Sequence, residues 1–342
     1  MIDDTLKKLI SGTALSQQET YLIFREIAQD GLTASQVAGL LIALRIKGET
    51  AEEIAGAAQA IREKVTPIKV SRSPLVDTCG TGGDGQNTFN ISTAAAFVIA
   101  GAGTAVAKHG NRAVSSQCGS ADVLKALGAN VDASDERVAE CINSLGVGFM
   151  FAPKLHPAFR SVAAIRRELG VRTIFNLLGP LTNPAGATRQ VIGVFSSRYV
   201  PIVGGALALL GTEHVWVVHG EGQDEVSVTG ETEICEVLGG HLNLFRITPE
   251  EMGLGRWQVS DLKGGIAAYN AQIIRDVFTG QKGAPRDAVL ANAGAGLLVG
   301  ANASSLREGI AMAAESIRSG GATDKLDALI ELSNRGEGAS AQ

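Results

Sequence analysis

Pro74-Leu-Val-Asp-Thr-Cys-Gly-Thr-Gly-Gly-Asp-Gly-Gln-Asn-Thr-Phe-Asn-Ile-Ser-Thr93 is the stretch around which the rest of the chain is arranged. Residues 74–78 are typical of a short buried strand, and a glycine-rich loop follows them. Ser92 or Thr93 can cap a helix that begins at Ala94. A strand, a glycine loop and a helix N-terminus bring free backbone N–H groups and the positive end of a helix dipole together. The stretch therefore predicts a phosphate-binding site.

Other glycine-rich motifs fit this loop less well. Gly80, Gly82 and Gly85 match G-x-G-x-x-G, but a dinucleotide-binding unit needs a helix at the last glycine and an acidic residue about 20 positions later. Here the helix is expected to begin several residues after the last glycine. The place of the acidic residue is taken by the apolar segment Ala105-Val-Ala107. No G-x-x-x-x-G-K-[ST] is present, which excludes a P-loop. A lone glycine cluster is most often a flexible turn. Phosphate binding is favoured by the polar side chains around it, namely Asp84, Thr88, Asn90, Ser92 and Thr93.

Composition narrows the class of protein. The 342 residues carry 30 basic and 35 acidic side chains, a net charge of −5, which offers no basic face to a nucleic acid. A hydrophobic content of 45% with 42 glycines indicates an α/β protein with a substantial core. The four cysteines lack C-x-x-C spacing, so we expect reduced thiols in a cytoplasmic protein. The acidic start is unlike a signal peptide, and no apolar run is long enough to span a membrane.

Residues 1–70 predict a small helical domain. Capping boxes begin at Ser16, Thr33 and Thr50, each followed three residues later by Glu or Gln. Gly31 and Gly48 stand where left-handed C-caps are expected, and a short helix at 4–10 precedes the boxes. No catalytic residue types occur here in suggestive spacing. We therefore expect this unit to serve packing, including packing against a second copy of itself.

From Ser73 onward, strands and helices alternate. This order predicts a mostly parallel sheet flanked by helices, with ligands at the carboxyl ends of the strands. Residues 176–185 contain helix breakers and are expected to form a loop. After 247 the chain is expected to be mainly helical, with a fourth capping box at Ser305 and a frayed tail. We expect further strands at 104–107, 147–151, 190–195 and 213–219, a hairpin of 233–238 and 241–247, and helices at 120–127, 138–145, 157–169 and 199–210.

A second donor-rich loop, residues 108–120, also lies between a predicted strand and a predicted helix. Surface basic residues are usually only solvated. Because this is the second such loop in succession, a second phosphate site is the better interpretation. The donors suited to it are Lys108, Arg112, Ser115, Ser116 and Ser120.

Two further segments carry candidate side chains. His156 precedes the helix that contains Arg166, a guanidinium that either lies along an apolar surface or binds a planar carboxylate through paired hydrogen bonds; the sequence leaves these two interpretations even. Asp224 and Glu225 follow a buried strand. Neighbouring acids are often only solvated, but beside phosphate-binding loops they suit Mg²⁺, which prefers one or two carboxylates with water and phosphate oxygens. Zinc-type spacing is absent, which argues against a transition metal.

Several ordered motifs together resemble the anthranilate phosphoribosyltransferase family, within the superfamily that includes the pyrimidine-nucleoside phosphorylases. The match runs over nearly the whole chain, and such a series is highly specific. The motifs are Asp77-Thr-Cys-Gly-Thr-Gly-Gly-Asp84, Asn90-Ile-Ser-Thr93, Lys108-His-Gly-Asn-Arg-Ala-Val-Ser-Ser116, Gly119-Ser-Ala-Asp122, Phe151-Ala-Pro-x-x-His-Pro-Ala158, Arg172-Thr-Ile-Phe-Asn-Leu-Leu-Gly-Pro-Leu-Thr-Asn-Pro184 and Val218-His-Gly-x-x-Gly-x-Asp-Glu225.

The resemblance implies an all-helical domain of residues 1–70, joined by helices near 165–185, and an α/β domain of residues 71–164 and 186–342. It implies a homodimer through the helical parts. It also implies transfer of the phosphoribosyl group of 5-phosphoribosyl 1-pyrophosphate (PRPP) to the amine of anthranilate, in tryptophan biosynthesis. Catalysis would be electrostatic and positional, with no residue assigned as an acid or base.

The same resemblance assigns residues to three ligands. PRPP would contact Gly80, Gly82, Gly83, Asp84, Thr88, Asn90, Ile91, Ser92, Thr93, Lys108, His109, Gly110, Asn111, Arg112, Ala113, Val114, Ser115, Ser116 and Ser120. Anthranilate would contact Gly80, His109, Asn111, His156, Arg166 and Gly179. Magnesium would be bound through Ser92, Asp224 and Glu225.

Two other functions are weighed against this one. A pyrimidine-nucleoside phosphorylase of related fold would be expected to carry an extra C-terminal domain that these 342 residues lack. A non-catalytic relative that binds nucleic acid is disfavoured by the acidic balance and by the presence of Asn111, Arg166, Asp224 and Glu225.

Overall fold

The computed structural model describes residues 2–113 and 117–336. Its N-terminal bundle consists of α1 (Ile2–Ile10), α2 (Gln17–Ile27), α3 (Ala34–Lys47) and α4 (Ala51–Arg62). The capping boxes expected at Ser16, Thr33 and Thr50 are all present. Helices α2 and α4 approach closely because Gly56 has no side chain, and a Cβ there would lie 2.2 Å from the carbonyl oxygen of Gln17.

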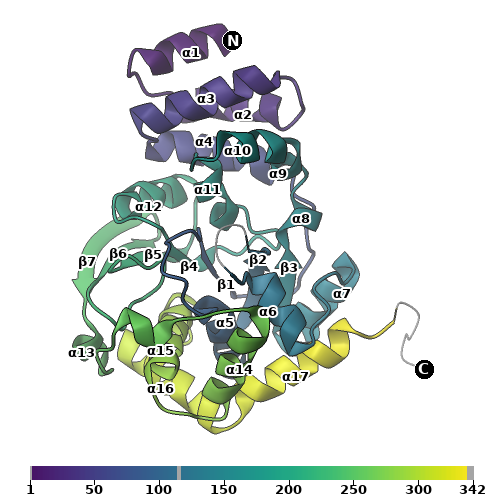
Figure 1. Cartoon of the computed structure of the whole chain (residues 1–342), viewed down its shortest axis with the longest axis vertical. Helices are drawn as coiled ribbons and strands as arrows, with labels where there is room; N and C mark the ends of the chain where they lie inside the picture. Colours follow the sequence, from purple (N-terminus) through teal and green to yellow (C-terminus); the bar gives the residue numbers. More distant parts are fainter. Residues whose placement is uncertain (1, 114–116, 337–342) are drawn as a thin grey trace.

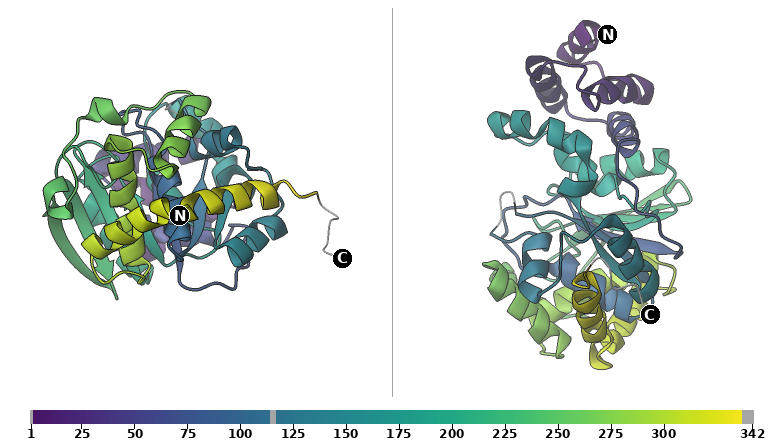
Figure 2. Two further views of the ribbon diagram at one scale, coloured as in Figure 1. Left: turned by 90° about the horizontal axis from the view of Figure 1, so that it is seen from below. Right: turned by 90° about the vertical axis from the view of Figure 1, so that its right-hand side faces the viewer.

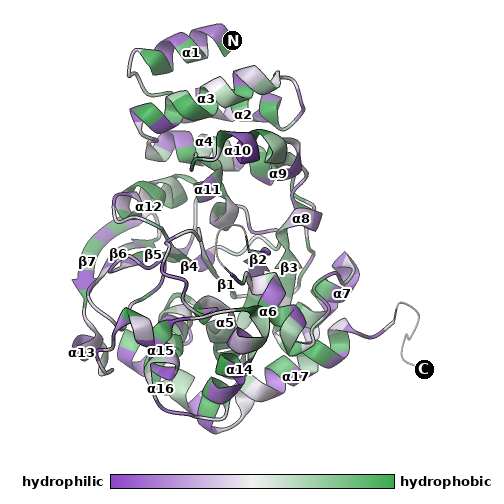
Figure 3. Cartoon of the chain, in the orientation of Figure 1, coloured by the Kyte–Doolittle hydropathy of each residue, from purple (hydrophilic) through white to green (hydrophobic). Residues whose placement is uncertain are grey.

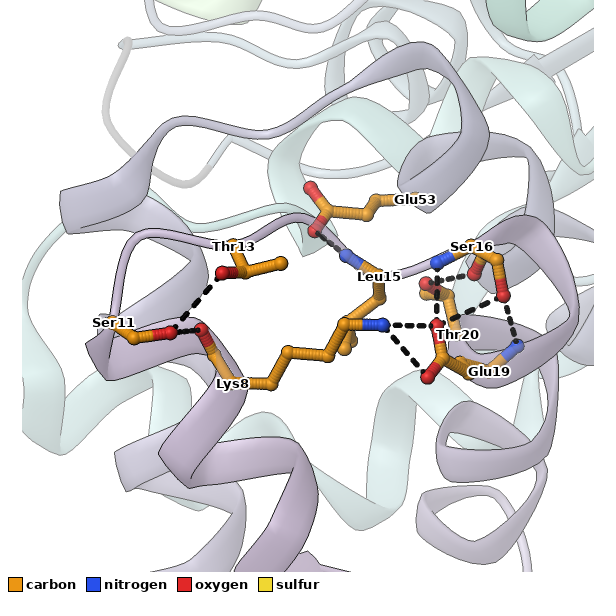
Figure 4. A network of polar contacts seen from close by, with 8 residues as sticks. All are labelled: Lys8, Ser11, Thr13, Leu15, Ser16, Glu19, Thr20 and Glu53. Carbon is orange, nitrogen blue, oxygen red and sulfur yellow. Dashed lines mark hydrogen bonds and ion pairs between the residues drawn. The ribbon is translucent and has the colours of Figure 1, made fainter.

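Glu53 connects two parts of this bundle. Its buried carboxylate accepts hydrogen bonds from the backbone N–H groups of Leu15 and Thr50, each at 2.9 Å. The ammonium group of Lys47 lies 2.9 Å from the same carboxylate. Figure 4 shows the Leu15 contact beside the Ser16–Glu19 capping box, to which Lys8 donates. One carboxylate therefore fixes the segment before α2 against the turn between α3 and α4.

The α/β part is built on a 7-stranded sheet in the order β3-β2-β1-β4-β5-β6-β7. Strands β1 to β5 pair in parallel and β6 and β7 pair antiparallel, which confirms the mostly parallel sheet. The hairpin turns at Gly239 and Gly240, whose φ angles of 55° and 82° suit the tight turn expected there. The strands are β1 (Leu75–Gly80), β2 (Ala105–Gly110), β3 (Val147–Phe151), β4 (Arg189–Gly193), β5 (His214–Gly220), β6 (Thr232–Leu238) and β7 (His241–Ile247).

Alternate residues of the central strands face opposite cores. In β5, Trp216 and Val218 pack with the C-terminal helices, whereas Val215 and Val217 pack with α12 and the bundle. The bundle and the C-terminal helices consequently lie at opposite ends of the molecule, with the sheet between them (Figures 1 and 2). The helices of the α/β part are α5 (Ile91–Gly101), α6 (Ser120–Leu127), α7 (Asp135–Glu140), α8 (Ala152–Leu155), α12 (Tyr199–Leu209), α13 (Pro249–Met252), α14 (Ala267–Phe278), α15 (Ala284–Val299), α16 (Leu306–Arg318) and α17 (Gly321–Ser333).

Some local expectations are wrong. The helix expected at 157–169 is broken at Val162 into α9 (Pro157–Ser161) and α10 (Ala163–Leu169), and α10 has no fully buried residue. Figure 3 shows the hydrophilic character of α10, and contacts place it on α3. The loop expected at 176–185 instead contains α11 (Phe175–Leu178), which contacts α4, and the 3₁₀ turn Gly179–Leu181.

Smaller differences concern helix ends. Helix α2 ends at Ile27 with Ala28 as its C-cap, and the positive φ of 55° belongs to Asp30 rather than Gly31. Ser305 caps α16 as expected, but Glu308 returns to the backbone of Ser304, so the full box is not formed. Helix α7 continues as the π-helical turn Cys141–Leu145, and a 3₁₀ turn spans Val259–Leu262.

No helix in the described ranges is long and apolar enough to cross a membrane. The four cysteines are free thiols, and all are buried.

We expect Glu53→Ala to lower the free energy of unfolding by about 3–5 kcal/mol, because it leaves Lys47 buried without its carboxylate. Urea denaturation followed by circular dichroism measures the change. Glu52→Ala, an exposed neighbour on the same helix, should be close to neutral. Equal stability of the two variants would contradict the role given to Glu53.

Candidate functional site

The site forms where the strand order reverses, between the neighbouring strands β1 and β4. Gly80 of β1 is in register with Gly193 of β4. Asp224, which follows β5, crosses directly over both glycines. A Cβ at Gly80 would lie 2.2 Å from Asp224 Oδ2, and one at Gly193 would lie 1.6 Å from the Asp224 carbonyl oxygen. Only glycine at both strand ends admits Asp224, in the kind of crevice where open α/β sheets bind ligands.

The glycine loop is attached to this aspartate. The backbone N–H of Gly82 donates to Asp224 Oδ2 at 2.7 Å. Gly82, Gly83 and Gly85 have φ angles of 67°, 75° and 80°, which explains why the loop needs glycine. The guanidinium group of Arg172 donates to the Gly83 carbonyl and lies 4.4 Å from the centre of the Phe195 ring.

Helix α5 contributes its N-terminus to the same crevice. It begins at Ile91, so the expectation that Ser92 or Thr93 caps a helix starting at Ala94 is wrong. Asn90 occupies the N-cap position, but its side chain donates to the Cys118 carbonyl and makes no capping hydrogen bond to the first turn. The N–H of Ser92 donates to Glu225 Oε1 at 3.2 Å. The hydroxyl of Thr93 is buried without a hydrogen-bond partner among the described residues.

Three carboxylates lie close together at this end of the sheet. Burial raises the pKa of Asp224, and the nearby charge of Asp84 raises it further. Burial likewise raises the pKa of Glu225, and Asp224 adds to the effect. A cation bound beside these carboxylates would lower both pKa values, so the cluster is suited to a cation site.

Asp224, Glu225 and Ser92 offer oxygen ligands, which Mg²⁺ prefers. No group of three His, Cys, Asp or Glu side chains arranged to hold a metal occurs in residues 2–113 or 117–336. A divalent ion here would take Asp224 and Glu225, with Ser92 beside them, and complete its shell from water and substrate oxygens.

Lys108 and Asp77 are both buried and lie close enough to influence each other's charge, an arrangement that the sequence did not reveal. Asp77 is fully buried in β1, and its carboxylate accepts from the backbone N–H of His109 at 3.2 Å and from Asn183 Nδ2 at 2.8 Å. Burial raises the pKa of Asp77, while the charge of Lys108 opposes that shift. The Lys108 ammonium donates to the Thr78 carbonyl and lies 3.4 Å from Ser92 Oγ. A charged residue inside an apolar strand was the available signal for Asp77.

The donor-rich loop is held by the start of α6. Asp122 accepts from the backbone N–H groups of Ala113 and Gly119, each at 2.9 Å. Ser120 Oγ accepts from the N–H of Asn111 at 3.1 Å. Arg112 lies over the Phe151 ring at 5.5 Å. Val114, Ser115 and Ser116, expected to contact PRPP, lie outside the described residues.

His109 and His156 meet beside this loop. Their Nε2 atoms are 2.9 Å apart, and both rings are buried. His109 also bonds to the backbone of Gly179, a contact that favours a protonated nitrogen at that position. His109 Nε2 is then the acceptor and His156 Nε2 the donor, so His156 Nδ1 carries no proton. That atom is buried and has no partner among the described residues.

An aromatic stack leads from the histidines to Arg166. Phe159 contacts His156 and Phe175, with ring centres 5.3 and 5.5 Å apart. The Arg166 guanidinium lies 5.8 Å from Phe159 and 5.6 Å from Phe175. Burial lowers the pKa of Arg166, and no carboxylate within the described residues pairs with it. His156 and Arg166 thus both contact the ring of Phe159, and neither Phe159 nor Phe175 was identified from the sequence.

Two family models match this chain. The one described as "Glycosyl transferase family, helical bundle domain" covers residues 3–65, and "Glycosyl transferase family, a/b domain" covers residues 72–323. A curated relative, anthranilate phosphoribosyltransferase of Anaeromyxobacter dehalogenans, is 58% identical over 330 residues, which are 96% of this chain and 98% of that protein.

Solved structures agree with these matches. Anthranilate phosphoribosyltransferase from Thermus thermophilus is 47% identical with a TM-score of 0.92, over 97% of this chain and all of the other. The Saccharomyces cerevisiae enzyme in complex with PRPP and Mg is 30% identical with a TM-score of 0.87, over 97% of both chains. A complex of that yeast enzyme with 4-fluoroanthranilate gives a TM-score of 0.85.

The buried histidines predict a pH effect on stability. Burial lowers the pKa of His156 to about 4 and that of His109 well below its usual range. Between the ordinary value of about 6.5 and the folded value, the unfolded chain binds more protons, so stability falls as pH falls. Each histidine contributes a slope of up to about 1.4 kcal/mol per pH unit in that window.

The comparison of His156→Gln with the original chain isolates this effect, because other titrating groups are common to both. Urea denaturation at pH 5 and pH 7 should show a smaller pH-dependent loss for the variant. His241→Gln, which changes an exposed histidine, should keep the original loss. A His156→Gln variant with that same loss would show that the ring is protonated in the folded state.

Proposed function

The chain belongs to the anthranilate phosphoribosyltransferases of the glycosyl transferase family, and we propose that it transfers the 5-phosphoribosyl group of PRPP to the amine of anthranilate, releasing pyrophosphate. The observation that carries this proposal is the convergence at one sheet edge of the glycine loop, the start of α5 and two carboxylates, beside an arginine between aromatic rings. PRPP requires a diphosphate site with a divalent cation, and anthranilate requires a site for a planar carboxylate.

PRPP is assigned to the two strand-end loops. The backbone at Gly82 and Gly83 and the first turn of α5 suit the pyrophosphate, because the positive end of the helix dipole favours negative charge. Asp224 and Glu225 would hold Mg²⁺, which neutralises charge on the departing pyrophosphate. The remaining donors come from Asn90, Ser92 and the loop of Lys108 to Ser120.

Anthranilate is assigned to the stack around Arg166. The guanidinium can form paired hydrogen bonds with its carboxylate, while Phe159 and Phe175 hold the guanidinium plane. His109 and His156, uncharged at neutral pH, connect this stack to the loop that follows β2, because His156 contacts both Phe159 and His109. Gly80, Asn111 and Gly179 complete the proposed contacts.

The chemistry needs little proton transfer from the protein. The aniline-type amine is neutral at pH 7 and attacks C1 of the ribose with its lone pair, forming the N–C1 bond. The C1–O bond to pyrophosphate breaks with its electron pair, and the amine then releases one proton. Positioned donors stabilise the departing charge, and alignment of the two substrates lowers the entropic barrier.

We extend the proposal to the assembly. A helical domain of residues 1–70 with the segment near 165–185 is supported by the packing of α10 on α3 and of α11 on α4. Ile10 and Ile46 on this domain are 78% and 81% exposed, which supports burial against a second copy. The four free cysteines support a cytoplasmic location.

Loss of anthranilate fluorescence tests the reaction directly. We expect the signal to fall when the purified protein is mixed with anthranilate, PRPP and Mg²⁺, and to stay constant once EDTA removes the metal. Thymidine with phosphate serves as the comparison substrate pair. Persistent fluorescence in the complete mixture would reject the proposed reaction.

Arg166→Ala should raise the KM for anthranilate about 10- to 150-fold, because a charge-assisted hydrogen bond contributes about 1.5–3 kcal/mol. The KM for PRPP should change little. Arg167→Ala is the matched control, since Arg167 is the exposed neighbour on α10. An unchanged anthranilate KM in Arg166→Ala would remove this residue from the site.

A further inference from the structure

Residues 262–270, here called the clasp, lie against the glycine loop although they come much later in the chain. The N–H of Phe89 donates to the Leu262 carbonyl at 3.0 Å, and the N–H of Gly264 donates to the Asn87 carbonyl at 2.8 Å. Thr88 and Lys263 form an antiparallel bridge between these two contacts. The clasp therefore fixes the backbone of the segment that leads into α5.

Asn270 ends the clasp with a buried side chain. Only 1% of its surface is exposed. Its Oδ1 accepts from the N–H of Gly265 at 2.7 Å, and its Nδ2 donates to Asn90 Oδ1 at 2.9 Å across 180 residues of sequence. Asn90 Nδ2 in turn donates to the Cys118 carbonyl at 3.2 Å. Cys118 directly precedes Gly119 and Ser120, the start of α6.

The N–H group of Gly265 determines which way each of these hydrogen bonds runs. A backbone N–H can only donate, so Gly265 requires the oxygen of the Asn270 amide, which turns the Asn270 NH₂ group toward Asn90. Asn90 must then present its own oxygen to Asn270, and its NH₂ group is left for the Cys118 carbonyl. The orientation of one buried amide thus determines the orientation of the next.

We propose that Asn270 is a positioning residue for PRPP, which aligns the glycine loop with the loop that ends at Ser120 by orienting the Asn90 amide. The proposal rests on the assignment of PRPP to these two loops under the proposed function. It explains why a fully buried amide in α14 bonds to the residue at the N-cap of α5. It also predicts that loss of Asn270 affects PRPP rather than anthranilate.

Gly264 offers a second way to disturb the same contact. A Cβ at Gly264 would lie 2.8 Å from the N and Cα atoms of Phe89 and 2.9 Å from Asn270 Oδ1, so a methyl group must move the clasp away from the loop. At the adjacent Gly265 a Cβ meets only the side chain of Tyr269, at 3.1 Å. Because Tyr269 is 56% exposed and can move, Gly265→Ala is a matched control.

The experiment measures PRPP binding and steady-state kinetics for four variants. We expect Asn270→Ala and Gly264→Ala to raise both the Kd for PRPP, measured by calorimetry with Mg²⁺, and the KM for PRPP about tenfold. The KM for anthranilate should stay within twofold of the original value, and Gly265→Ala should behave like the original chain. Asn270→Asp, which can accept from Gly265 but cannot donate to Asn90, should resemble Asn270→Ala.

A double-mutant cycle separates positioning from general destabilisation. If Asn270 acts through Asn90, Asn90→Ala with Asn270→Ala should bind PRPP no more weakly than Asn90→Ala alone. Unchanged PRPP binding in folded Asn270→Ala and Gly264→Ala, equal rises in both KM values, or additive losses in the cycle would overturn the inference. An original chain inactive with PRPP and anthranilate would instead reject the proposed function.

Discussion

The close approach of Asp224 to Gly80 and Gly193 is the constraint on which the rest of the site depends. These glycines are neighbours across β1 and β4, and each is too near Asp224 to carry a side chain. The contact places a carboxylate above the point where the strand order reverses, and that carboxylate in turn holds the glycine loop through Gly82. The pairing of Gly80 with Gly193 therefore determines the path of the loop after β5. That path in turn determines where the proposed cation ligands lie.

The charges of the buried side chains at this edge of the sheet make it suited to a bound cation. Burial raises the pKa of Asp77, Asp224 and Glu225. The charge of Lys108 opposes this rise at Asp77 and at Glu225, whereas the charge of Asp84 adds to it at Asp224 and Glu225. The acidic side chains at this edge of the sheet thus raise one another's pKa, and a positive charge bound there would oppose that effect.

Much of this was predictable from sequence, for local reasons. The capping boxes, the glycine loop and the βα alternation depend on neighbouring residues, so the bundle, the parallel sheet and the loops at its edge followed from them. Asn270 was missed because its partner, Asn90, is 180 residues away. The helix break at Val162 and the short helix α11 were missed because packing against α3 and α4, rather than local propensity, determines them. The early start of α5 escaped because Asn90 occupies the N-cap position while its side chain serves Cys118.

The uncharged state of His109 and His156 has a consequence for selectivity. Rings that carry no positive charge at neutral pH cannot compensate a second negative group on an aromatic ligand. Arg166, held between two phenyl rings, matches a single carboxylate. Under the proposed assignment of anthranilate to Arg166, the site therefore selects aromatic acids by charge as well as by shape, and a dicarboxylate of similar size gains no ion pair from the two histidines.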